Sequence, residues 1–89
     1  MPKALTNKIK KLNMEDRGDY LLPHIIFNSC REVLVEGSKG VLEYNTKRVR
    51  LNAGRYILKF CGDGLCLRAL TADEIIIMGD IVSFEFCSV

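Results

Sequence analysis

The stretch RVRLNAGRYILKFC, at residues 48–61, decides the fold class. Apolar and cationic side chains alternate from Arg48 to Asn52, and apolar residues recur at every second position from Tyr56 to Phe60. A period of two indicates β-strands with one buried face. Ala53-Gly54 lies between the two runs, and glycine reaches the positive φ of a tight turn at little cost. The stretch therefore predicts a β-hairpin.

The same pattern continues on both sides of this hairpin. Short runs rich in Val, Ile, Leu, Tyr and Phe recur at spacings typical of antiparallel sheets. The expected strands are Ile25–Phe27, Glu32–Glu36, Val41–Tyr44, Arg48–Asn52, Tyr56–Cys61, Leu65–Leu70, Glu74–Met78 and Ile81–Cys87. Glycine-containing turns, among them Gly62-Asp63-Gly64 and Gly79-Asp80, are expected between them. Such short connections leave no room for crossover helices, so the sequence predicts an all-β antiparallel meander of about seven or eight short strands.

The carboxyl-terminal strands are apolar on more than one face. Ile75 to Met78 are apolar in succession, and Val82, Phe84 and Phe86 share a face opposite Ile81. A strand that is apolar on both faces is covered on both sides. We therefore expect the sheet to fold into a sandwich or half-barrel, or to meet a second copy of the chain through a sheet face or edge.

Residues 1–20 differ in composition from the all-β domain predicted for residues 21–89. The first eleven residues hold four lysines and no acidic residue. Apolar residues spaced by four and three predict a short amphipathic helix, and a flexible basic segment is the alternative. Basic amphipathic helices bind anionic membrane surfaces. The residues expected to contact a membrane or partner are Leu5, Lys8, Ile9, Lys11 and Leu12.

Length and composition favour one small intracellular domain. The chain has 89 residues, of which 48% are hydrophobic and 27% charged, which is typical of a folded domain. A net charge of +2 is too small to indicate nucleic-acid binding by itself. No secretory signal or membrane-spanning run is visible. We therefore expect a cytoplasmic protein whose four cysteines are thiols.

No residue pattern indicates catalysis, a cofactor or a metal. The single histidine, His24, stands alone beside Pro23, and no nucleophile elbow or phosphate loop is present. The cysteines lack the close pairs of structural zinc sites. Lys47, Arg48 and Arg50 form a small basic cluster, but only Tyr44 accompanies it as a stacking partner. We predict neither an enzyme nor a cofactor, and nucleic acid is the disfavoured partner.

Three stretches together carry a resemblance to a known family. They are Gly40–Tyr44 (GVLEY), Lys47–Asn52 (KRVRLN) and Thr71–Phe86 (TADEIIIMGDIVSFEF), preceded by the pair Leu22-Pro23. In order and spacing they resemble the YabP/YqfC family of sporulation proteins, most closely its YqfC branch, over residues 20–87. Local departures occur around Cys30 and at Cys61, Gly62 and Gly64.

The resemblance implies a spore-forming member of the Firmicutes, action in the mother-cell compartment and a neighbouring gene for a membrane protein of the YqfD type. It implies no catalytic motif. The first functional hypothesis is therefore a non-enzymatic scaffold or adaptor that works with a membrane partner. The alternative is a small β-module that binds nucleic acid or another ligand.

Overall fold

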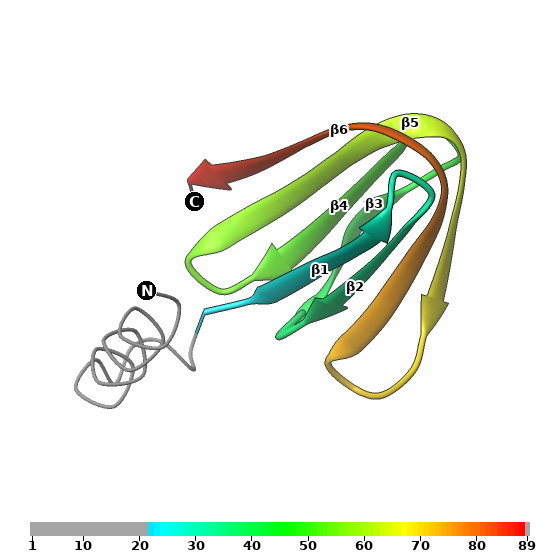
Figure 1. Ribbon diagram of the computed structural model, residues 1–89. Helices are drawn as coiled ribbons and strands as arrows, with labels where there is room; N and C mark the ends of the chain where they lie inside the picture. The colour runs from blue at the N-terminus through cyan, green and yellow to red at the C-terminus, as the bar shows by residue number, and fades with distance from the viewer. Residues whose placement is uncertain (1–21, 89) are drawn as a thin grey trace, which may run out of the picture.

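The computed structural model describes residues 22–88 (Figure 1). They form one antiparallel sheet, and no helix occurs among them, so none there could cross a membrane. The strands are β1 (His24–Ser29), β2 (Glu32–Glu36), β3 (Gly40–Tyr44), β4 (Arg48–Ala53), β5 (Tyr56–Ala69) and β6 (Glu74–Ser88). The predicted all-β antiparallel fold is confirmed. The helix expected within residues 1–20 lies outside the described residues.

The predicted count of seven or eight strands is wrong, because two expected turns lie inside long strands. Gly62-Asp63-Gly64 belongs to β5 and Gly79-Asp80 to β6. These stretches oppose each other, with Gly62 paired to Ile81 and Asp63 to Asp80. The register shifts on both sides of them, as it does at β-bulges. The four expected strands are therefore two strands of 14 and 15 residues.

Close approach of the two backbones explains why glycine occupies these bulges. A Cβ atom at Gly62 would overlap the carbonyl oxygen of Asp80. At Gly79 the backbone has a φ of +125°, and a Cβ atom there would lie 2.5 Å from the carbonyl oxygen of Gly64. Bulges bend strands and increase their twist, so the β5–β6 hairpin turns sharply in its middle (Figure 1).

The bend folds the sheet, whose strand order is β1-β2-β6-β5-β4-β3, into two layers. One layer holds β1, β2, the first half of β6 and the second half of β5. The other holds the second half of β6, the first half of β5, β4 and β3. The residues buried between them are Val33, Val35, Val49, Leu51, Ala53, Leu58, Phe60, Leu65, Ile75 and Ile77.

One backbone clamp fixes the end of the sandwich at which β2 and β6 meet. The carbonyl oxygen of Asp73 accepts hydrogen bonds from the amides of Gly37 (3.0 Å) and Ser38 (3.1 Å). Ser38 is also buried, with only 3% of its surface exposed. The clamp joins the β2–β3 connection to the β5–β6 turn.

Candidate interaction surface

An aromatic cluster closes one opening between the two layers. All four phenylalanines of the chain belong to it. Phe60 lies in the core with its ring centroid 4.8 Å from that of Phe84 on β6, and Phe27 of β1 packs on both. The chain of contacts continues outward from Phe84 to Phe86 and from Phe86 to Tyr56. The cluster thus runs from the core to the surface.

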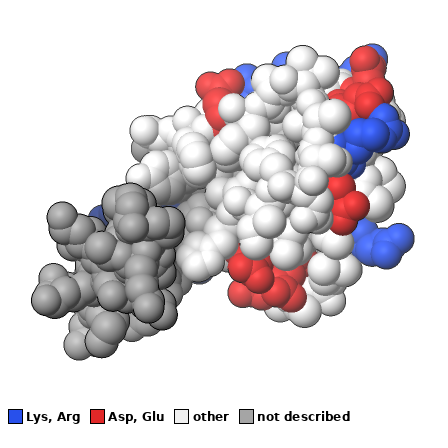
Figure 2. Space-filling view, in the orientation of Figure 1, with Lys and Arg blue, Asp and Glu red and all other residues white. Residues whose placement is uncertain are grey.

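The outer members of this cluster are substantially exposed. Phe86 is 55% exposed and Phe27 is 45% exposed, while the neighbouring Val82 is 76% exposed. Figure 2 shows that uncharged side chains make up most of the face turned to the viewer, with charged groups at its margins. Aromatic residues are enriched in the buried centres of protein interfaces, and charged residues are depleted there. This composition is suited to binding a protein.

The second half of β6 also presents an unpaired strand edge. β2 pairs only with residues 74–78 of β6, so residues 82–88 have β5 on one side and no described strand on the other. Their outward backbone N–H and C=O groups therefore lack a strand partner. Such an edge is a template for pairing with another chain. We refer to residues 82–88 of β6 as the β6 edge.

The other open edges of the sheet carry features that obstruct pairing with another strand. A register shift at Leu42 disrupts β3, and another at Asn28 disrupts β1. The second half of β5 is covered by the β3–β4 connection, because the amide of Leu65 donates to the carbonyl oxygen of Thr46 and that of Leu67 donates to the Tyr44 hydroxyl. Bulges and covering loops are the usual protection of natural edges.

The β6 edge has little such protection over most of its length. The bulge at Val82 lies at its beginning, and Glu85 is its only charged residue. The Glu85 carboxylate lies 3.5 Å from the ammonium group of Lys59 on β5. Residues 83–88 therefore form a regular strand edge beside the exposed aromatic surface.

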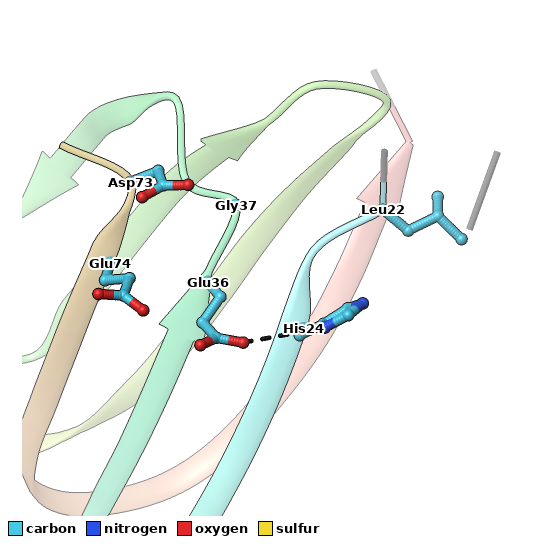
Figure 3. Close-up of a pocket in the computed structure, with 6 residues that line it drawn as sticks. All are labelled: Leu22, His24, Glu36, Gly37, Asp73 and Glu74. Atoms are coloured by element: carbon cyan, nitrogen blue, oxygen red, sulfur yellow. Dashed lines mark ion pairs between the residues drawn. The ribbon is translucent and has the colours of Figure 1, made fainter. Parts of the chain in front are cut away.

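Two hollows open beside the first described residues. The apolar hollow, of about 300 Å³, is lined by Leu22, Pro23, Tyr56 and Phe86. The polar pocket, of about 260 Å³, shares Leu22 and is otherwise lined by His24, Glu36, Gly37, Asp73 and Glu74 (Figure 3). The aromatic surface and the acidic residues therefore meet at the start of the domain.

The polar pocket has the composition of a charged surface site. The imidazole Nδ1 of His24 lies 3.8 Å from a carboxylate oxygen of Glu36. Thr71 donates its hydroxyl to Asp73 or Glu74, at 3.1 and 3.2 Å. Within residues 22–88, no group of three or more His, Cys, Asp or Glu side chains is placed to hold a metal ion. The pocket presents carboxylates that a cationic group could approach.

Carboxylates form ion pairs with the basic residues that the sequence offered for nucleic-acid binding. Glu43 accepts a hydrogen bond of 2.8 Å from Arg50 and lies 3.8 Å from Arg48. Lys47 is paired with Asp63. Phosphate binding would require these pairs to be exchanged for phosphate contacts. The cluster is therefore a set of surface ion pairs in this structure.

The remaining candidate residues are not gathered into one site. All four cysteines are free; Cys30 and Cys66 are exposed, whereas Cys61 and Cys87 are half-buried. Leu5, Lys8, Ile9, Lys11 and Leu12 lie outside the described residues. Sequence reasoning placed Val82, Phe84 and Phe86 on one face but missed Phe27 and Tyr56, which the fold brings beside them.

Comparison with known proteins gives one match. The model of the YabP family matches residues 22–89, which is most of the chain and includes every strand described above. No curated protein and no solved structure matches the chain.

Proposed function

Since the chain belongs to the YabP family and is therefore sporulation-related, we propose that it acts in spore formation as a non-catalytic adaptor. Its β6 edge binds an extended segment of a partner protein, which adds a strand to the sheet. The observation that carries this proposal is the unpaired edge beside the exposed Phe86 and Val82. In strand addition, main-chain hydrogen bonds supply affinity, and pockets for alternate side chains supply specificity.

The aromatic cluster is suited to anchor the added strand. Phe86 is held between Phe84 and Tyr56 by edge-on ring contacts, with centroids 4.8 and 5.7 Å away. A rigid aromatic side chain loses little conformational freedom on binding, and such residues dominate interface energetics. The partner is therefore expected to place apolar side chains against Phe86 and Val82.

Charge arrangement favours a different protein over a second copy as the occupant. The sequence Phe84-Glu85-Phe86 is symmetric, so two β6 edges paired about Glu85 would place Phe84 opposite Phe86. The same pairing would set the two Glu85 carboxylates directly opposite each other, and like charges in that position are destabilising. A homo-oligomer through this edge is therefore the weaker of the two assemblies.

The partner we propose is a membrane protein of the YqfD type, in the mother cell. This part of the proposal rests on the family resemblance. Under it, the chain is held at the membrane by its partner.

A complementation experiment tests the edge. A strain lacking the gene receives the wild-type copy, a Val82→Lys/Phe86→Lys copy, or a matched Val41→Lys/Leu42→Lys copy. The control residues are apolar and 47% and 49% exposed, but they lie on the bulged β3 edge. We expect the β6 variant to lose heat-resistant spores and to leave the membrane fraction, while the β3 variant behaves as wild type.

Two further outcomes separate the parts of the proposal. Equal spore titres for both variants, with both proteins folded by circular dichroism, would refute the role of the β6 edge. A copy lacking residues 1–20 distinguishes the domain from the basic segment. Full rescue by that copy locates the contact in the sandwich and removes the membrane role predicted for the segment.

A further inference from the structure

The apolar hollow is an unfilled site at the entrance of the domain. Two of its walls are Leu22 and Pro23, the first described residues, and the others are Tyr56 at the start of β5 and Phe86 near the end of β6. The rings of Tyr56 and Phe86 meet edge-on at 5.7 Å. Whatever fills the hollow must be apolar where it meets these four side chains.

The surroundings of the hollow are acidic on the side of the polar pocket. Glu36 on β2 and Glu74 on β6 are direct cross-strand partners, and Asp73 is adjacent (Figure 3). Like charges placed directly opposite each other destabilise a sheet. His24, the other ionisable residue of the pocket, lies on the far side of Glu36 from Glu74. A cation beside Glu36 and Glu74 would relieve their repulsion.

One segment of this chain has the complementary composition and ends where the hollow lies. Residues 1–21 end next to Leu22, and they contain Leu5, Ile9 and Leu12 interleaved with lysines. Leu22 lies ten positions after Leu12, and an extended chain of that length spans about 33 Å. The segment can therefore reach both the hollow and the carboxylates without any movement of the sheet.

We propose that residues 5–12 of the chain bind this entrance in the same molecule, with apolar side chains in the hollow and Lys8 and Lys11 beside Glu36 and Glu74. The occupant is argued from the position at which the segment joins the domain and from charge complementarity. Short tethers give effective concentrations in the millimolar range, so even a contact that is weak between separate molecules is populated within one chain.

Limited trypsin digestion of the full chain tests the proposal. Trypsin cuts after Lys8, Lys10 and Lys11, and docking slows these cuts relative to a free peptide of residues 1–20. An exposed ion pair changes an equilibrium constant by a factor of about 1.5 to 5. Glu36→Gln/Glu74→Gln should therefore raise the cleavage rate by about 2- to 25-fold. The matched Glu32→Gln/Glu85→Gln variant, with carboxylates removed away from the pocket, should be cut like wild type.

A separate variant tests the proposed contact between the apolar side chains of residues 5–12 and the hollow. Leu5→Ser/Ile9→Ser/Leu12→Ser changes no residue of the described core, and its cleavage is compared with a peptide that carries the same changes. We expect the variant and its peptide to be cut at equal rates. Persisting protection of this variant would refute the role of the hollow.

Two results would overturn the assignment as a whole. Cleavage of the wild-type chain at the rate of the peptide would show that the segment does not dock. Protection that appears only as protein concentration rises would assign the hollow to the segment of a second copy. The test uses purified protein, so its outcome is separate from that of the sporulation experiment.

Discussion

The three glycines of the β5–β6 bend allow the fold to be tested by separate physical causes. Gly62 has an ordinary φ but no room for a Cβ atom, because Asp80 lies against it. Gly64 has a φ of +61° and open space around it. Gly79 combines a φ of +125° with a Cβ position 2.5 Å from a backbone oxygen. Substitution by alanine at each position therefore isolates crowding, backbone strain, or both.

The expected losses of stability follow from these differences. Gly64→Ala should cost about 1–2 kcal/mol, the penalty of a left-handed conformation for a residue with a Cβ atom. Gly62→Ala must push two paired backbones apart, and overpacking of this kind costs about 1–3 kcal/mol or more. Gly79→Ala carries strain of about 1–3 kcal/mol in addition to crowding. Gly79→Ala should therefore be the most damaging substitution.

Urea unfolding followed by circular dichroism measures these losses. A domain in this 89-residue chain has a total stability of about 4–13 kcal/mol, so the loss of about 2–6 kcal/mol expected for Gly79→Ala is a large share of that stability. A wild-type midpoint for Gly62→Ala would refute the reasoning. It would mean that Gly62 is not opposed by Asp80, as would be the case if residues 62–64 formed a hairpin turn.

Three other predictions concern the core, the cysteines and the basic cluster. Phe60→Ala should lower the unfolding free energy by about 3–5 kcal/mol, because the ring is fully buried between Phe27 and Phe84; a loss below 1 kcal/mol in urea unfolding would contradict this packing. Ellman's reagent should modify Cys30 and Cys66 faster than Cys61 and Cys87 in the folded protein, and a single uniform rate would be inconsistent with the fold. Fluorescence anisotropy with oligonucleotides at physiological salt should show dissociation constants above about 10⁻⁴ M, weaker than ordinary non-specific binding; tighter, salt-sensitive binding that Arg48→Glu/Arg50→Glu abolishes would favour the nucleic-acid alternative.

The sequence was sufficient to predict the strands but not their continuity. Short runs rich in β-branched and aromatic residues, divided by turn signals, identified the strands, and period-two alternation within several of them showed which side chains face the core. Glycine at Gly62 and Gly79 was interpreted as a hairpin signal, since local sequence cannot separate a turn from a bulge. The difference lies in the partner strand: Gly62 is glycine because Asp80, eighteen positions away, lies against it. That contact is long-range, and no window of local sequence contains it.

The same limit applies to the candidate site. The shared face of Phe84 and Phe86 follows from alternation within one strand, and its apolar character predicted that a folded sheet or a second copy covers it. Phe84 is partly buried against the core, whereas Phe86 remains 55% exposed. Phe27 joins this face through the sandwich, and Tyr56 joins it through the β5–β6 register. Neither contact could be inferred without the bend. The acidic pocket was likewise missed, because Glu36 and Glu74 resemble ordinary solvent-facing residues until β2 and β6 are paired.

The bend that builds the core also leaves the β6 edge unpaired beside exposed aromatic residues. All five residues of β2 pair with residues 74–78 of β6, and the bulge at residues 79–82 carries residues 83–88 into the other layer. β2 cannot follow, because it ends at Glu32, opposite Met78. The edge is therefore a geometric consequence of folding one sheet onto itself, and its aromatic residues occupy the opening that this folding leaves. A substitution that straightened the hairpin would remove the core and the edge together, whereas Val82→Lys/Phe86→Lys changes the edge and the hollow that Phe86 lines and leaves the buried core residues in place.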